Sequence, residues 1–447
     1  FVCLVSAMGG LLFGYDWVVI GGAKPFYELY FNIADSPSSQ GLAMSIALVG
    51  CMIGACTCGW LADKIGRKNL LIVSAIVFLL SSLLTGAFSS FDLFLVARFF
   101  GGVGIGIASG LSPMYIAEIA PSNIRGKLVS LNQMTIVLGI LAAQIVNWLI
   151  AEPIPAGSIA SDIATSWNGQ MAWRWMFWAA AVPSLAFLLM AFFIPESPRW
   201  QAMNGQVVAA TDTLTRIGGV DYAHTEMRAI SIANSAIKEQ AGLATLFSRP
   251  FGKVLVLGLF IAVFQQWCGT NVIFNYAQEI FQSAGYSVGD VLFNIVITGV
   301  ANVVFTIIAI NIVDKLGRRK LMLIGALGLC IIYAILGLCY YLHITGFFMM
   351  VLVVAAIGCY AMTLGPCTWV LIAELFPNRV RAIAVATCTF ALWVGSSTLT
   401  YTFPFLNASL GSYGTFWIYS LVCLVGFVFF MAKLPETKGK SLEQLEE

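Results

Sequence analysis

The chain has 447 residues, of which 60% are hydrophobic and only 10% are charged, and its mean hydropathy is +0.90. This composition is typical of a polytopic membrane protein and excludes an ordinary water-soluble domain. The net charge of +2 gives no reason to expect nucleic acid as a partner. The eleven cysteines fall almost wholly inside apolar runs without metal-ligand spacing, so we interpret them as small core residues and expect neither metal nor cofactor.

Apolar runs dominate the chain from its first residue. Phe1 already lies inside one, so we expect a preceding segment in the natural protein, and the first run carries Asp16 and no cleavage-site pattern, which excludes a signal peptide. Each run is long enough for a membrane span of about 20 residues. They cover residues 1–22, 40–62, 69–89, 92–115, 128–151, 171–194, 254–281, 289–312, 321–343, 346–373, 382–405 and 413–433. We therefore predict an all-α membrane protein with twelve transmembrane helices.

The polar stretch between the sixth and seventh runs divides the chain. We predict an N-terminal six-helix bundle (1–194), a cytoplasmic helical linker (195–253), a C-terminal six-helix bundle (254–434) and a cytoplasmic tail (435–447). With both termini inside, the inner loops, linker and tail hold all of the 23 Lys and Arg residues except Lys24, Arg98 and Arg174. This is the positive-inside asymmetry, so we expect a multi-pass protein of the cell inner (cytoplasmic) membrane, with the lipid bilayer as partner.

The two halves repeat three short motifs in the same order. The pairs are 63–67 (DKIGR) with 314–318 (DKLGR), 117–121 (AEIAP) with 373–377 (AELFP), and 195–197 (PES) with 435–437 (PET). Repeats of one orientation are related by an axis along the membrane normal.

The charged residues of these motifs, and the Arg that follows each central Glu, fall near the cytoplasmic ends of helices. They are Arg67, Glu118, Arg125, Glu196, Arg318, Glu374, Arg381 and Glu436. We predict that they form a cytoplasmic gate, because ion pairs there can hold the halves together while the protein opens outward and must part when it opens inward. A purely structural role is the alternative for any one of them.

The stretch from Phe264 to Asn271 places Gln265, Gln266 and Asn271 inside an apolar run. Hydrocarbon offers amides no partners, and the Cys268-Gly269-Thr270 step weakens the helix, so we expect this segment to break and to line a cavity. Amides that donate and accept hydrogen bonds suit a neutral polyhydroxylated ligand. The alternative is that these amides only bond neighbouring helices.

Asp16 and Arg98 are charges inside predicted spans. Because such charges are costly without partners, we expect these two to form an ion pair. Neither His224 nor His343 lies in the middle of the membrane, so no histidine relay competes for proton transfer. The alternative is a static structural ion pair.

Four motifs together resemble one family over the whole chain. They are Gly59-x-x-x-Asp63-Lys64-x-Gly66-Arg67, Pro195-Glu196-Ser197-Pro198-Arg199-Trp200, Gln265-Gln266 and Pro435-Glu436-Thr437-Lys438-Gly439. This combination resembles the sugar porters of the major facilitator superfamily. Segments 112–118 and 125–133 are similar to bacterial proton-coupled D-xylose symporters in particular, and the animal facilitative glucose transporters are more distant relatives.

The resemblance implies a set of sugar contacts made by amides and indoles. They are Gln133, Gln265, Gln266, Asn271, Asn302, Trp369 and Trp393. Amides can bond hydroxyls as donor and acceptor, while an indole covers the apolar face of a pyranose; for the two tryptophans the alternative is ordinary packing.

The chain also departs from the family at the predicted pocket. Leu392 stands before Trp393 where relatives usually place an amide, and Asn275 stands before Tyr276 where a tyrosine pair is common. These departures leave the identity of the sugar open.

The resemblance implies proton-coupled symport of a monosaccharide (D-xylose, D-glucose or similar) by alternating access, with Asp16 and Arg98 as the proton-coupling pair. The alternatives are a facilitative sugar uniporter, in which this pair is structural, and a transporter-like sugar sensor, which the short tail after Pro435 disfavours. No zinc-binding His motif or serine elbow appears, so we do not expect an enzyme.

Overall fold

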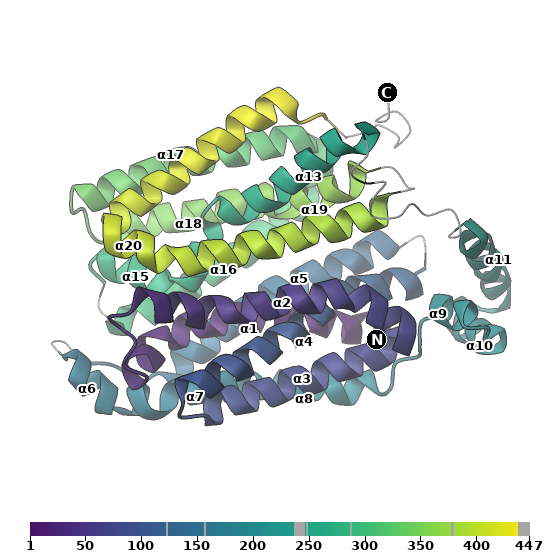
Figure 1. The fold of residues 1–447 in the computed structure, drawn as a ribbon, viewed down its shortest axis with the longest axis horizontal. Coiled ribbons are helices and arrows are strands. Elements are labelled where there is room, and N and C mark those ends of the chain that lie inside the picture. The colour runs from purple at the N-terminus through teal and green to yellow at the C-terminus, as the bar shows by residue number, and fades with distance from the viewer. Residues whose placement is uncertain are drawn as a thin grey trace.

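The computed structural model describes residues 1–121, 124–155, 158–236, 246, 249–286, 288–376 and 380–436, and within these ranges every regular element is a helix. Figure 1 shows the long helices running side by side in two groups, with a small helical unit at one end. One group holds the first part of the chain and the other holds the last part, and we call these groups the first and second halves.

The first half is built from long helices that cover the predicted spans, and α1 continues beyond the predicted end of its span. They are α1 (Val2–Tyr30), α2 (Pro37–Ile65), α3 (Arg67–Ala87), α4 (Phe91–Ile119) and α5 (Arg125–Ile150). A short helix, α6 (Ala160–Thr165), leads into the sixth span, which is assembled from η1 (Asn168–Ala172), α7 (Trp173–Ala179) and α8 (Ala181–Ala191). About 20 helical residues cross about 30 Å of hydrocarbon, and the six spans of this half are each long and apolar enough to do so.

The second half contains more interrupted helices. It comprises α13 (Arg249–Trp267), α14 (Thr270–Asn275), α15 (Ala277–Ser283), α16 (Val288–Leu316), α17 (Arg318–Tyr341), α18 (Phe347–Met362), α19 (Leu364–Glu374) and α20 (Arg381–Lys433). The first three form the seventh span, and α18 with α19 forms the tenth.

The last long helix supplies two spans. Among the described residues eleven helices are long and apolar enough to cross a membrane, and the last of them, Ile383–Lys433, has 51 residues. A helix of that length rises about 75 Å, more than twice what a bilayer needs. Gly411 has non-helical angles (φ 65°, ψ 177°) and divides it, so the twelve predicted spans are confirmed.

Two spans are broken in mid-membrane. The seventh stops at Trp267 and restarts at Thr270, with Gly269 in the left-handed region (φ 87°), which confirms the break predicted there. Glycine is favoured at position 269 for two reasons. Its φ is positive, and a β-carbon there would lie 2.9 Å from the ring of Tyr419. The tenth span is interrupted at Thr363 (φ −127°, ψ −81°). Broken helices near the membrane centre are where many transporters build their substrate sites.

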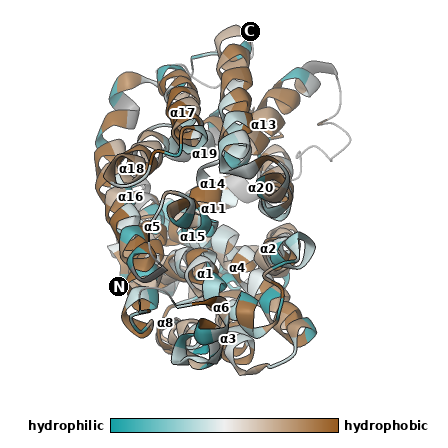
Figure 2. Cartoon of the chain, turned by 90° about the vertical axis from the view of Figure 1, so that its left-hand side faces the viewer, coloured by the Kyte–Doolittle hydropathy of each residue, from teal (hydrophilic) through white to brown (hydrophobic). Residues whose placement is uncertain are grey.

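The two halves meet along two seams. Figure 2 looks along the helices from the end opposite the linker and shows α5 beside α16 on one flank and α2 beside α20 on the other. Within the first half α1 packs on α5 and α2 packs on α4, and within the second half α17 packs on α20. The space between the two seams is therefore where a substrate path can lie.

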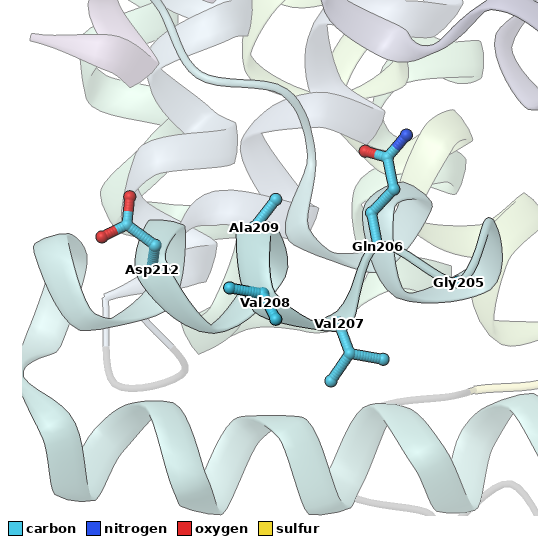
Figure 3. Close-up of a pocket in the computed structure, with 6 residues that line it drawn as sticks. All are labelled: Gly205, Gln206, Val207, Val208, Ala209 and Asp212. Carbon is cyan, nitrogen blue, oxygen red and sulfur yellow. The ribbon is translucent and has the colours of Figure 1, made fainter.

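The linker forms the small helical unit at the end of Figure 1, with α9 (Pro198–Met203), α10 (Val207–Gly218) and α11 (Val220–Ala236). A cavity of about 590 Å³ lies on it. Figure 3 shows the residues that line this cavity, which are Gly205, Gln206, Val207, Val208, Ala209 and Asp212. These residues come from one short stretch at the start of α10, outside the membrane helices, so this cavity is separate from the predicted sugar pocket. The positive-inside asymmetry predicts that the linker end is cytoplasmic, and we call the opposite end the outer end.

Candidate functional site

Three predicted amides form one hydrogen-bonded chain at the break of the seventh span. The side-chain amide of Asn271 donates to Gln266, the Gln266 amide donates to Gln265 Oε1 at 2.5 Å, and the Gln265 amide donates to the Tyr360 hydroxyl. All three amide residues are buried. Tyr360 lies on α18, two residues before the end of that helix. The hydrogen-bonded chain of amides therefore connects the seventh span to the tenth.

This arrangement is suited to a polyhydroxylated ligand. Each amide nitrogen has two hydrogens, and the chain of bonds uses one from each, so a second N–H remains on every amide. Because every donor points along the chain in the same direction, the amides polarise one another and become better partners for a hydroxyl. The alternative role, in which these amides only bond neighbouring helices, applies in part to Gln265, because its amide donates to Tyr360 on α18.

Trp393 packs against aromatic residues of the opposite half. Its ring centroid lies 5.9 Å from that of Phe13 and 6.1 Å from that of Trp17, both on α1. Phe13 and Trp17 are themselves in edge contact at 5.3 Å. A three-ring cluster thus bridges α1 and α20 between the halves.

The other predicted sugar contacts make no described bond to the amide chain. Gln133 is an exposed side chain on α5, and Asn302 is buried on α16. Trp369, on α19, is 42% exposed, as are other indoles in the spans such as Trp148 and Trp417 at 40%, so its exposure does not decide between a sugar contact and ordinary packing.

Asp16 and Arg98 lie together inside the first half. Arg98 Nη1 is 2.5 Å from Asp16 Oδ1, and the two residues are only 5% and 2% exposed. The Arg98 guanidinium also lies 5.4 Å from the ring centroid of Phe177, while its Nε atom has no protein partner. The pair is held by a single hydrogen bond, so proton transfer to the carboxylate would remove the charge on which it depends.

The inner end of the first half is organised around Arg67. Its guanidinium bonds Glu118 through two nitrogens, at 3.1 and 3.2 Å, and Asp63 at 2.9 Å. Glu196 accepts the backbone N–H groups of Arg67 at 2.9 Å and Lys68 at 3.1 Å, so its carboxylate caps the start of α3. The linker is thereby tied to this half.

The second half repeats that geometry. Arg318 donates to Glu374 at 3.3 Å, and Glu436 accepts the backbone N–H of Arg318 at 3.1 Å at the start of α17. The sequence repeat is therefore also a repeat of local geometry, with a guanidinium paired with one carboxylate and a helix start capped by another.

The described ion pairs of the inner end lie within each half and not between the halves. Arg381 donates to the backbone carbonyl of Phe376 in its own half at 3.0 Å, and the side chain of Arg125 lies outside the described residues. An inner gate that closes by bringing the two clusters together stays a prediction.

Several residues of this site were not predicted. Tyr360 carries no sequence signal beyond its place beside the tenth-span break. Trp17 and Phe13 are spaced by four residues on α1, the spacing of side chains on one helix face, which is the only signal that could have found them. Lys24, which bonds Glu28 and Glu279, was visible as a lysine outside the positive-inside pattern with a glutamate four residues later.

Comparison with known proteins gives one consistent result. Residues 2–447 match the family model described as sugar (and other) transporter. The chain is 37% identical to the arabinose-proton symporter of Bacillus subtilis, over 100% of this chain and 95% of that protein. It is 35% identical to the D-xylose-proton symporter of Escherichia coli, over 100% and 94%. The fold is similar to the inward-open conformation of the E. coli xylose transporter XylE, with a TM-score of 0.87 at 34% identity, over 100% and 98% of the two chains.

Proposed function

Because the chain belongs to the sugar transporter family, we infer that it is a proton-coupled symporter of a monosaccharide in the cytoplasmic membrane. The relatives that it resembles are named as symporters of protons with arabinose or with xylose. The substrate is a neutral pentose or hexose, which the amide chain can bind through its hydroxyls without any charge to match.

The observation that carries the coupling is the buried pair of Asp16 with Arg98. Trp17 follows Asp16 directly and contacts Trp393 of the other half, so the carboxylate is one residue from the aromatic cluster between the halves. A proton on Asp16 weakens its bond to Arg98 and frees α1 to move relative to α4. The same movement shifts Trp17 against Trp393, which connects the proton to the pocket.

Alternating access supplies the transport cycle. Sugar binds to Gln265, Gln266 and Asn271, with Gln133, Asn302, Trp369 and Trp393 completing the pocket as the halves close around it. The structure described above corresponds to the inward-facing state of this cycle. Two observations support this assignment: the likeness to an inward-open structure, and the contacts between α1 and the α14–α15 segment at the outer end. The inner clusters around Arg67 and Arg318 are then apart, and they approach one another when the protein faces outward.

The test is uptake of labelled sugar into proteoliposomes, with and without an imposed proton gradient. We expect the protein to accumulate D-xylose, L-arabinose or D-glucose against a gradient only when protons flow inward. Asp16→Asn keeps the size and a hydrogen bond but not the removable proton, so it should bind sugar normally and lose accumulation. Asp92→Asn, the same change at an exposed aspartate on α4, should leave accumulation intact. Accumulation at the wild-type level in Asp16→Asn would show that this residue does not couple, and the uniporter would then be the better description.

A further inference from the structure

Lys24 is a buried cation that the transport mechanism above does not use. It lies on α1 eight residues after Asp16, and it is only 2% exposed. An ammonium group removed from water destabilises a protein strongly unless carboxylates or other polar groups surround it. Its partners therefore indicate what it does.

Those partners come from both halves of the molecule. Lys24 Nζ lies 2.8 Å from Glu28 Oε1 on the same helix. It also forms an ion pair with Glu279 on α15, and it stands 5.4 Å from the ring centroid of Tyr276, where α14 and α15 join. Glu28 moves with Lys24 in any rigid-body motion, whereas Glu279 and Tyr276 belong to the other half.

The contact lies at the outer end, where the halves are closest. Gly21 precedes Lys24 by one turn, and a β-carbon there would be 3.0 Å from the carbonyl oxygens of Phe274 and Asn275, so the two backbones touch. Figure 2 faces this end and shows α1 next to α15. A cavity of about 410 Å³ adjoins the contact and is lined by Lys24, Glu28 and Glu279 together with residues of α20.

We propose that Lys24 and Glu279 form a charged latch that holds the outer end of the carrier closed. Outward opening separates α1 from α15 and so separates these two charges. Lys24 then retains its ion pair with Glu28, and this pair in the first half has no net charge. Glu279, whose side chain is already 22% exposed, takes water from the adjoining cavity. The latch opens without leaving a buried charge alone, which is the condition for a reversible gate.

The latch is connected to the predicted sugar pocket through two consecutive short helices, α14 and α15. Asn271, the last amide of the chain, lies in α14, and Glu279 lies eight residues later in α15. The two helices join at Tyr276, which has a non-helical conformation (φ −122°, ψ 26°) and is anchored by a hydrogen bond from its hydroxyl to the Thr400 carbonyl at 2.7 Å. A sugar that draws Asn271 toward it therefore moves the segment that carries Glu279.

The proposal rests on the alternating-access function, but its test needs no transport. Amide hydrogen exchange, followed by mass spectrometry on purified full-length protein without sugar, reports opening at each end of the helices separately. Glu279→Gln removes the charge across the halves and keeps the shape. Glu28→Gln is the matched control, because it removes a carboxylate from the same lysine without cutting a link between the halves.

In Glu279→Gln we expect exchange to quicken at the outer ends of α1 and α15 and to slow at the inner ends around Glu118 and Glu374. The shift corresponds to a ratio of outward-facing to inward-facing protein that is about tenfold higher than in the wild type. Glu28→Gln should not quicken exchange at the outer end, because Lys24 keeps Glu279 in the closed state and would have no carboxylate in the outward-facing state. If Glu279→Gln is not monodisperse, the combined variant Lys24→Met, Glu28→Gln, Glu279→Gln has no unpaired charge and should show the same shift. Quicker exchange at the outer end alone, equal effects of the two single variants, or no change would overturn the latch. Failure of the wild-type protein to accumulate sugar with a proton gradient, with the exchange shift still present in Glu279→Gln, would instead count only against the transport proposal.

Discussion

Gln266 occupies the middle of the amide chain, so replacing it with alanine removes hydrogen bonds on both sides. It accepts a hydrogen bond from Asn271 and donates one to Gln265. Gln266→Ala leaves the Asn271 amide without its acceptor and Gln265 Oε1 without its donor, and it removes a predicted contact to sugar. A lost buried hydrogen bond of this kind costs about 1–3 kcal/mol, which is roughly a ten- to hundredfold loss of sugar affinity.

Calorimetry with purified protein measures this affinity, and Gln206→Ala is the control because Gln206 is exposed on the linker. The unfolding temperature separates the two interpretations of the amides. If they only bond one another and α18, Gln266→Ala lowers the unfolding temperature while sugar affinity stays at the wild-type value. That outcome would remove Gln266 from the binding site.

The break in the seventh span is a property of a helix, and Gly269 makes it possible. An alanine there would take an unfavourable left-handed conformation, which costs about 1–2 kcal/mol. Its β-carbon would also press against the ring of Tyr419 at 2.9 Å, and overpacking adds about 1–3 kcal/mol. Gly269→Ala should therefore lower the unfolding temperature and displace Gln265, Gln266 and Asn271 from their bonds.

Gly346→Ala is the matched control for this substitution. Gly346 also has a positive φ, 92° against 87° for Gly269, but no heavy atom lies within 4 Å of the place where its β-carbon would be. It tests a backbone cost without a clash, and that cost is the higher of the two, because ψ is −155° at Gly346 and −10° at Gly269. Thermal unfolding followed by intrinsic fluorescence should show at least as large a loss for Gly269→Ala, and a clearly smaller loss there would mean that packing against Tyr419 contributes nothing.

The helices themselves were predictable because a membrane leaves few choices. A run of about 20 apolar residues must form a helix there, and a glycine beside amides marks where that helix breaks. The boundaries differ where polar residues are buried between the halves. The first span was predicted to end at residue 22, whereas α1 continues to Tyr30 because Lys24 and Glu28 neutralise each other inside the helix.

Contacts between the halves were much harder to predict. Asp16 and Arg98 could be paired because they were isolated charges in the same half with few alternatives. Lys24 and Glu279 are 255 positions apart, and a single sequence does not say which helix faces meet across the substrate path. The same holds for Trp17 and Trp393, whose contact depends on how α1 and α20 are rotated.

Considered as a whole, the carrier is a two-state system with charges at both ends of the path. Reversing the charge at Glu374 should destabilise the outward-facing state, because a lysine there would oppose Arg318 and the arginines that approach it when the inner end closes. The affinity for sugar offered from outside falls in proportion to the outward-facing fraction. Glu374→Lys should therefore weaken binding from the outside about tenfold relative to the inside.

The measurement is the half-saturating sugar concentration for uptake in right-side-out and in inside-out vesicles. Asp212→Lys, the same reversal at an exposed linker residue, should change neither value. If Glu374 only stabilises its own half, the variant unfolds at a lower temperature while the ratio of the two concentrations stays constant. That result would leave the inner clusters as structural supports.

Combining the two ends gives a stricter test. Glu279→Gln should favour the outward-facing state and Glu374→Lys the inward-facing state, and the two residues lie at opposite ends of the helices. Effects at distant sites on one equilibrium add as free energies, usually within about 0.5 kcal/mol. The double variant should therefore return the outside-to-inside affinity ratio to near the wild-type value. A double variant that behaves like either single variant would mean that the outer and inner ends do not share one two-state equilibrium, and the rigid-body form of alternating access would be wrong for this protein.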